Sequence, residues 1–522
     1  MSLLAKLQEL RQSASERVAF RQRVVDAVSA ADWARIERSE QLLSEACEVL
    51  EQSQQSSAKL RRLLFGSQSE KTDKVCPPPE PPPLPAKKKR QGHGRRAASE
   101  YTGARPVPVC HPSLKAGQQC EKCLRGKLCP KKPAVVLQVA GSPPITATRH
   151  EMERLRCNTC GAVFTAPTPP EAMKEKYDPS VAVTVGIFRF GCGLPHYRLA
   201  RLQESLGVPL PESTQWELIL PLAKIAEPIV LELTRQAAQS SLVHHDDTKM
   251  RVQALRKPGS ASAAAIDPKR KGTFTTAINA SVGDYAVTLF RTGWQHAGEN
   301  LTDLLQHRAA GLEPPIQMCD ALACNFNVEF QTLTANCLSH ARREMVDIRE
   351  SFPVECRHVL TQLGAVYRVD AEAKEQSLSA LQRLVHHQTH SGPVMAELER
   401  WMKAELEQKR VEPNSGLGKA FAYLQGHWEA LTLFLRVAGA PLDNNICERA
   451  LKMAIMHRKN SLGYKTVMGA KVGDIFMSLI HTCRSNGFNP FKYLLALAEH
   501  PELVAINPSA WLPWNYPQAE PA

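Results

Sequence analysis

The 522-residue chain lacks long apolar runs and a recognisable secretory signal. No stretch reaches the roughly 18 apolar residues that a membrane-spanning helix requires, so the sequence excludes integral membrane proteins. Met1 leads into a charged, helix-like stretch, which is unlike the apolar core of a signal peptide. We therefore expect a cytoplasmic protein without membrane partners. In that reducing compartment, paired residues among the 15 cysteines are more often zinc ligands than disulfides.

Acidic residues are scarce in one segment of the chain. Between Lys87 and Lys132 there are 13 Lys or Arg and two Glu, so 13 − 2 = +11 of the formal net charge of +13 lies there. The densest run is Lys87, Lys88, Lys89 and Arg90. It follows a segment with seven prolines, Cys76–Pro85, which predicts an extended linker. The basic run is either a solvated tail or a binding surface for a polyanion such as DNA.

Residues 1–75 contain no proline and only one glycine, Gly66, which predicts a helical segment. Apolar residues recur at multiples of seven along it, at Ile36, Leu43, Leu50 and Leu64, while a second apolar row is weak. The pattern fits a dimerising coiled coil, and it equally fits an amphipathic helix packed on its own domain. A homo-oligomer is therefore one expectation. The proline-rich linker and the basic run that follow this helical segment occupy residues 76–112.

Two Cys-x-x-Cys pairs lie within residues 113–172. They are Cys120 with Cys123 and Cys157 with Cys160. Each pair places two thiolates on one side of an ion, as tetrahedral zinc requires, so we predict one structural zinc in a ribbon-like module. The separation of 157 − 123 = 34 positions demands a long loop between the pairs. The alternative is a set of unrelated thiols.

Residues 173–240 show a helical pattern that is interrupted at Gly207 and resumes at Pro211-Glu212-Ser213-Thr214. A helix, a glycine-containing turn and a second helix are compatible with a helix-turn-helix DNA-binding unit. Pairs of helices with such turns also occur in proteins that bind no DNA, so both interpretations stay open. Residues 464–522 form a further helical region.

Residues 241–463 predict a mixed α/β core. Strand-like runs at 242–248, 273–278 and 285–290 precede a helix at 300–308 and a short strand that ends at Asp320. This order is typical of a ribonuclease-H-like sheet. Residues from about 351 to 438 are helical in pattern and predict an insertion before Glu448. The chain as a whole is expected to be a multidomain α+β protein.

Three carboxylates stand on predicted elements of this core: Asp246 within a strand, Asp320 at the end of another strand, and Glu448 at the start of a helix. Each residue alone would be interpreted as a turn or helix-cap residue. Together, two strand aspartates and a helix glutamate among basic residues suit magnesium and a phosphodiester substrate. Adjacent strand residues point to opposite faces, so only one of Asp246 and Asp247 can line such a site.

The order of motifs along the chain resembles the insertion-sequence-66 family, a group of bacterial DDE transposases, over nearly its whole length. The motifs are Leu63-Leu64-Phe65-Gly66-Ser67-Gln68-Ser69-Glu70-Lys71, the two Cys pairs, Leu194-Pro195-His196-Tyr197-Arg198, Asp246-Asp247-Thr248, Cys337-Leu338-Ser339-His340-Ala341-Arg342-Arg343 and Asp443-Asn444-Asn445-Ile446-Cys447-Glu448-Arg449. No single motif is decisive, but their order together is specific.

The resemblance implies a transposase that binds the terminal inverted repeats of its own element, cleaves DNA and transfers the strand to a target. The family has Asp-Glu-Thr where this chain has Asp246-Asp247-Thr248, and the first Asp is the ligand. Asp246, Asp320 and Glu448 would then hold two catalytic magnesium ions. Helper proteins of the same element and a nucleoid location are further implications.

The resemblance also implies phosphate contacts by basic residues. His340, Arg342 and Arg343 match the family element Cys-Trp-Ala-His-x-Arg-Arg, and an Arg fork grips phosphate in two-pronged fashion. The other residues expected to contact the DNA backbone are Arg449, Lys452, Arg458 and Lys459. The chain departs from the family at Ala321-Leu322, Leu338 and Ser461, where Gly-Tyr, Trp and Trp are usual, and we expect these residues to change the shape of the pocket.

Two other functions fit the same residues. One is a ribonuclease-H-like nuclease that cuts DNA without strand transfer. The other is a non-catalytic protein that binds DNA repeats through the zinc module and the basic run. Cleavage with strand transfer, cleavage alone and binding alone distinguish the three.

Overall fold

The computed structural model describes residues 143–156, 158, 160, 162–170, 175–255, 272–326 and 329–516, together with short stretches nearer the N-terminus (29, 31–39, 41–42, 45, 107–109, 113–119, 123, 125, 127–131, 134 and 136). The chain divides into two compact units: residues 78–144, and residues 1–77 with 145–522. Lys87, Lys88, Lys89, Arg90, Cys120 and Cys157 lie outside the described residues. Of the predicted N-terminal helix, residues 31–39 are described, and they are helical.

The backbone around each Cys pair runs antiparallel. In the smaller unit, Gln119 and Lys127 form an isolated antiparallel bridge that flanks the first pair in sequence. In the larger unit, β1 (Arg154–Arg156) pairs with β2 (Val163–Thr165), and the second pair falls between these strands in sequence. Of the four cysteines, Cys123 and Cys160 are described, and both are exposed.

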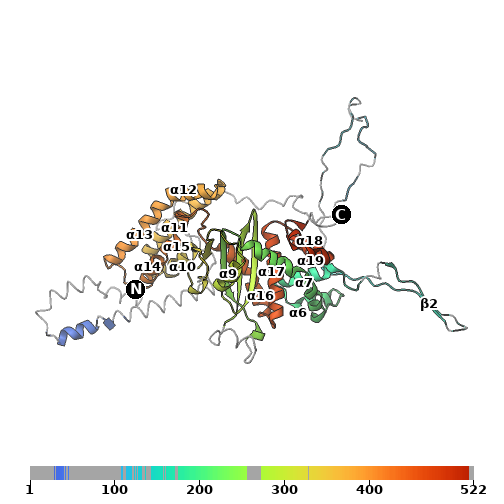
Figure 1. Ribbon diagram of the computed structural model, residues 1–522, viewed down its shortest axis with the longest axis horizontal. Helices are drawn as coiled ribbons and strands as arrows, with labels where there is room; N and C mark the ends of the chain where they lie inside the picture. Colours follow the sequence, from blue (N-terminus) through green and yellow to red (C-terminus); the bar gives the residue numbers. More distant parts are fainter. Residues whose placement is uncertain are drawn as a thin grey trace. The chain divides into compact units, whose positions relative to one another are not determined.

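A mixed five-stranded sheet forms the centre of the larger unit (Figure 1). The strands are β3 (Leu242–Lys249), β4 (Phe274–Val282), β5 (Tyr285–Gly293), β6 (Ile316–Cys319) and β7 (Leu333–Asn336). Their order is β5-β4-β3-β6-β7. β4 is antiparallel to both β3 and β5, whereas β6 and β7 run parallel to β3. The predicted order of strands is therefore present, within a fold of helices and a mixed sheet that agrees with the expected α+β class.

One core joins β3, β4 and β5 to helices from both ends of the domain. The helices before the sheet are α5 (Pro179–Gly186), the π-helical η3 (Ile187–Gly191), α6 (His196–Ser205) and α7 (Glu212–Ala237), and α9 (Ala297–Leu305) follows β5. The helices after it are α16 (Asn445–Ser461), α17 (Val467–Ser485), α18 (Pro490–Glu499) and α19 (Pro501–Ile506). The segment predicted over 173–240 thus packs in the same core as the sheet, with α7 buried along one face over its whole length.

A second core joins β6 and β7 to the helices that the sequence predicted as an insertion. These helices are α11 (Pro353–Glu375), α12 (Ala380–His390), α13 (Gly392–Glu407), α14 (Gly416–Gly426) and the short α15 (Trp428–Leu431), and α10 (Leu338–Ile348) precedes them. Buried apolar residues at helical spacing, such as Val359, Leu363 and Val366 of α11, explain this packing. No helix among the described residues is long and apolar enough to cross a membrane.

Helix α17 covers the open edge of strand β5 with one side chain per turn. The amides of Ala286, Thr288, Phe290 and Thr292 donate to the side chains of Asn486, Thr482, Ser478 and Asp474 at 2.9, 3.1, 2.9 and 2.7 Å, respectively. Four helix residues rise about 6 Å and two strand residues span about 6.8 Å, so the two periods match over this length. The edge that would otherwise pair with another chain is closed.

Asp474 is expected to make stability depend on pH. Burial raises the pKa of its carboxyl group to about 7, while the hydrogen bonds from Thr292 and the charge of Arg291 act in the opposite direction. The folded protein then holds a proton that the unfolded chain releases, so the free energy of unfolding falls as the pH rises from about 4 to about 7. For this one group the fall is up to roughly 1.4 kcal/mol per pH unit.

The variant Asp474→Asn keeps the shape of the side chain and removes this titration. Urea unfolding across the same pH range should show the variant gaining stability on the wild type as the pH rises. The control is Asp284→Asn, in the exposed turn between β4 and β5, which should follow the wild type. If the free energies of unfolding of Asp474→Asn and the wild type changed in parallel with pH, the pKa of the Asp474 carboxyl group would not be raised in the folded protein.

Candidate active site

The parallel register of β3 and β6 brings two of the predicted carboxylates to neighbouring positions. His244 is paired with Met318 in this register. Two residues further along, Asp246 therefore lies beside Asp320, which directly follows the last residue of β6. The Asp320 carboxylate is fixed by its own loop, because it accepts hydrogen bonds from the Leu322 amide and the Asn325 side chain.

Asp246 and Asp247 point to opposite faces of the sheet. His244, which shares the Asp246 face, contacts Asn444 at the start of α16. Asp247 faces the other way and accepts from the Ala297 amide at the start of α9, and its Oδ2 lies 2.8 Å from His296 Nδ1. Asp247 therefore anchors α9, while Asp246 shares its face of the sheet with α16.

Glu448 stands on the first turn of α16, whose N-terminal end is fastened to β4 and to the start of α10. Cys447 Sγ donates to the Ala277 carbonyl of β4 at 3.1 Å. The Asn444 amide donates to Cys337 Sγ at 3.2 Å, and the amide of Leu338 in α10 donates to the Leu442 carbonyl. These contacts fix the position of Glu448 relative to the sheet.

The buried side chain of Asn444 connects β3 directly to α16. Its Nδ2 donates to the His245 carbonyl at 2.9 Å, and its Oδ1 lies 3.1 Å from His244 Nδ1. Asp246 is the next residue on β3, and Glu448 is one turn along α16. Asn444 therefore fixes the spacing between these two carboxylates, a role that the motif alone did not reveal.

Asn444→Ala should weaken binding of a divalent cation and any metal-dependent activity by roughly 10–100-fold, the usual effect of losing an outer partner of a metal site. The matched control is Asn445→Ala, since the side chain of this neighbouring residue makes no hydrogen bond among the described residues. Titration with Mn²⁺ measures the affinity, and thermal unfolding checks that both variants fold. Equal Mn²⁺ affinities in the two variants would contradict the positioning role.

The carboxylates interact electrostatically. Burial raises the pKa of Asp246 to about 7, and the negative charges of Asp320, Asp247 and Glu448 add to the increase. Carboxylates that repel one another in this way favour a bound cation, because a cation offsets their mutual repulsion.

Two groups on α10 face the Glu448 carboxylate. His340 Nε2 lies 3.6 Å from Oε1, and Arg343 Nη2 lies 3.9 Å from Oε2. Oε1 is buried and has no hydrogen-bond partner among the described residues, and neither has His340 Nδ1. A buried carboxylate oxygen without a partner is costly, and a metal ligand bond would satisfy it. The oxygen donors and the crowded negative charge thus fit a divalent metal.

The remaining predicted phosphate contacts are placed around α16. Arg458 is fastened to the end of β3, because its Nη1 donates to Thr248 Oγ1 at 3.0 Å and to the Lys249 carbonyl. Arg449, Lys452 and Lys459 are exposed on α16. Arg342 lies on α10 together with His340 and Arg343.

Among the described residues there are two groups of possible metal ligands, and within each group the ligand atoms lie within 4.8 Å of one another. One group is Asp247, His296 and Cys324, and the other is Cys337, His340 and Glu448. Asp246, Asp320 and Glu448 do not form so tight a group in this part of the chain. Carboxylates that surround two ions about 3.5–4 Å apart must be spread more widely than those around one.

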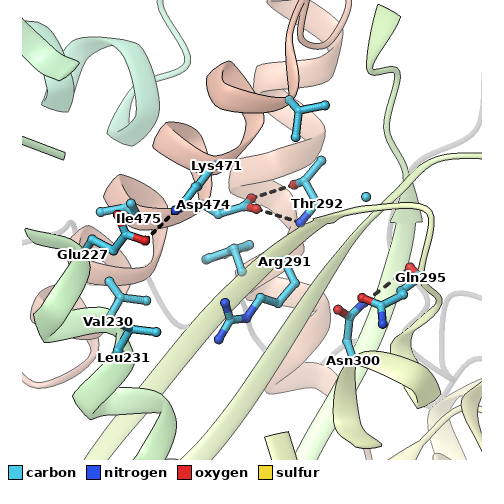
Figure 2. Close-up of a pocket in the computed structure, with 13 residues that line it drawn as sticks. Glu227, Val230, Leu231, Arg291, Thr292, Gln295, Asn300, Lys471, Asp474 and Ile475 are labelled. Carbon is cyan, nitrogen blue, oxygen red and sulfur yellow. Dashed lines mark hydrogen bonds and ion pairs between the residues drawn. The ribbon is translucent and has the colours of Figure 1, made fainter. Parts of the chain in front are cut away.

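A cavity of about 240 Å³ lies between α7, β5 and α17 (Figure 2). Its charged groups have partners: Lys471 pairs with Glu227 at 2.5 Å, and Asp474 accepts from Thr292. Arg291 donates to Thr234 at 2.9 Å. None of the three predicted carboxylates lines it, so we assign it no part in their chemistry.

Comparison with known sequences places this core in a family. A sequence model described as "Transposase IS66 family" matches residues 174–472, which is more than half of the chain. Two proteins of Sinorhizobium fredii, "Uncharacterized protein y4jD" and "Uncharacterized protein y4hP", are each 26% identical to it, over 385 and 391 residues. The alignments cover 70% and 71% of this chain, and 71% and 68% of those proteins, respectively. No solved structure matches.

Proposed function

The chain belongs to the IS66 transposase family, and we propose that it is a DDE transposase that binds the terminal inverted repeats of an insertion sequence, cleaves DNA and transfers the strand. Family membership implies a transposase that binds DNA and uses a divalent metal. The finer proposal is supported by one observation: three carboxylates, on β3, directly after β6 and on α16, interact electrostatically where β6 ends beside β3.

The order of the strands supports a ribonuclease-H-like catalytic domain. Three consecutive antiparallel strands are followed by α9 and then by two strands parallel to the first, in the order β5-β4-β3-β6-β7. Asp246 lies on the first strand of this series and Asp320 at the end of the fourth. The long helical segment α11–α15 separates this sheet from the glutamate helix, as an insertion in a catalytic domain would.

Asp246, Asp320 and Glu448 would hold two magnesium ions. Bound magnesium supplies positive charge at the attacking and leaving oxygens of a phosphodiester and lowers the pKa of the nucleophile. Asp246 would contribute to holding both ions, since the charges of Asp320 and Glu448 both raise the pKa of its carboxyl group. His340 and Arg343 orient Glu448 from the side of α10.

DNA would be held by basic side chains and by the Cys module. Arg342, Arg449, Lys452 and Lys459 supply phosphate contacts near the carboxylates, and Lys87, Lys88, Lys89 and Arg90 add sequence-independent affinity. Arg458 contributes chiefly by holding the end of β3. One zinc on Cys120, Cys123, Cys157 and Cys160 stabilises the module. A homo-oligomer would bring two DNA ends together, with helper proteins of the same element.

The test is an assay on linear DNA that carries one end of the element, with Mg²⁺ and a supercoiled target. A free 3′ hydroxyl at the end and a joined product are expected. Cleavage without joining would indicate a nuclease. Binding without cleavage, with all helper proteins of the element present, would indicate a non-catalytic DNA-binding protein.

A further inference from the structure

A groove of about 390 Å³ lies between α16 and α17, beside the π-helical η3. Its lining includes Arg449 and Lys452 of α16, His481 and Arg484 of α17, Gly191 and Met456. In the part of the chain that the structure describes, no acidic side chain lines it. Such a concentration of positive charge on a folded surface is unfavourable unless an anion offsets it.

The three cations of this groove are exposed and make no ion pair among the described residues. Some exposed cations of the described chain have carboxylate partners, as Lys403 has in Glu399 and Arg410 in Glu405. The groove is distinguished by gathering three exposed cations with no carboxylate among its lining residues in the described part of the chain.

The backbone of η3 pre-positions Arg484. The Nη1 atom of Arg484 donates to the carbonyl of Gly191, the last residue of η3, at 3.1 Å. A β-carbon added at Gly191 would come within 3.2 Å of Nη2, so the glycine leaves the guanidinium room beside the backbone. A guanidinium held in this way loses less conformational entropy when it binds phosphate.

The electrostatic environment of His481 shows the sign of the local potential. Burial and the charges of Arg484 and Arg449 lower its pKa to about 4. The ring is therefore neutral at pH 7, with Nδ1 3.2 Å from the Ser485 hydroxyl. A ring that stays neutral beside two guanidinium groups adds hydrogen-bonding capacity without adding repulsion.

The groove lies within one helical turn of Glu448 along α16. Arg449 directly follows Glu448, and Lys452 follows it by four residues, which is a rise of about 6 Å. Phosphates of one DNA strand are spaced by a similar distance, so a strand at the carboxylates would continue toward Lys452 and Arg484.

We propose that this groove binds the phosphodiester backbone of DNA next to the segment that reaches Asp246, Asp320 and Glu448. The proposal rests on the transposase function proposed above. Arg449, Lys452 and Arg484 bind phosphate oxygens, and Met456 lies against the sugars. The bound DNA is either the end of the element or its flank, since both present the same backbone chemistry.

The experiment is a salt titration of DNA binding with the full chain. Arg484→Gln and Lys452→Gln should each lower the magnitude of the slope of log affinity against log salt by about 0.9. At 0.1 M salt this equals roughly an eightfold loss of affinity if the contact contributes nothing at 1 M. The matched controls are Arg400→Gln and Lys492→Gln, exposed cations on α13 and α18, which should keep the wild-type slope.

Single neutral methylphosphonates then locate the phosphate. In the wild type, substitution at one or two adjacent positions should weaken binding, and Arg484→Gln should be insensitive at those positions. Positions inside the repeat identify the element end, and positions outside it identify the flank. If Arg484→Gln and Lys452→Gln show the same salt slope as the control variants, while the wild type binds and cleaves DNA, the proposal that the groove binds DNA is wrong and the proposed function stands. A wild type that binds no DNA overturns the proposed function as well.

Discussion

Asp246→Asn, Asp320→Asn and Glu448→Gln should each reduce DNA cleavage by more than the roughly 10–100-fold that losing an outer partner of a metal site costs. Each change removes an anionic oxygen at nearly constant shape. Binding of the inverted repeat should stay close to wild type, because the phosphate contacts proposed above lie on other residues. Cleavage of an end-labelled repeat duplex measures activity, and mobility shift measures binding.

The matched control for the first of these variants is its neighbour. Asp247→Asn changes the same chemical group one residue along β3, on the face that anchors α9 through His296 and Ala297. It should lower stability modestly, by about 1–3 kcal/mol, and leave the cleavage rate of the folded enzyme within severalfold. Loss of cleavage in Asp247→Asn with full activity in Asp246→Asn would reverse the assignment of the ligand.

A second readout separates a metal ligand from a residue that acts on DNA. If the three carboxylates hold the ions, each variant should also bind Mn²⁺ more weakly in the absence of DNA. A variant that keeps wild-type Mn²⁺ affinity but loses cleavage would place that carboxylate outside the metal site.

The sheet was predictable because its strands carry a strong local signal. The runs 273–278 and 285–290 are rich in β-branched and aromatic residues, and they form β4 and β5. The alternation of strand side chains also predicted that Asp246 and Asp247 face opposite ways, and the contacts of His244 and Asp247 agree with this. These features depend only on near neighbours in sequence.

The support of the carboxylates could not be predicted, because it joins residues far apart in sequence. Asn444 contacts a strand 199 positions earlier, and His340 and Arg343 face Glu448 more than one hundred positions later. The family motif implies phosphate contacts for His340 and Arg343, and their position beside the Glu448 carboxylate adds a role that no spacing rule gives. The match between α17 and the edge of β5 likewise becomes visible only when both elements are placed.

Without a bound cation, the arrangement of the carboxylates is itself unfavourable, and this favours metal binding. A buried oxygen without a partner on Glu448 and a strongly raised pKa at Asp246 both destabilise the empty arrangement. Asn444 and the cysteine contacts of α16 hold the carboxylates together despite that cost. Binding of a divalent metal would then stabilise the folded site.

Cys120→Ser or Cys157→Ser should remove zinc from the protein. Freshly purified wild type should contain about one zinc per chain, held by thiolates. Thiolate zinc sites of small modules contribute apparent binding free energies of roughly 10–16 kcal/mol, so loss of one ligand should both release the ion and unfold the module. The antiparallel backbone on either side of each pair, at Gln119 with Lys127 and in β1 with β2, fits two knuckles.

The same variants should leave the catalytic domain folded, because its two cores contain no residue of the module's four cysteines. Elemental analysis measures the zinc, limited proteolysis locates the unfolded segment, and mobility shift should show weaker DNA binding. Cys192→Ser is the matched control, since Cys192 is exposed but lies between η3 and α6, outside the module. Zinc-free wild-type protein, or full zinc content in both knuckle variants, would mean that the four cysteines are unrelated thiols and that DNA binding depends on the basic segments alone.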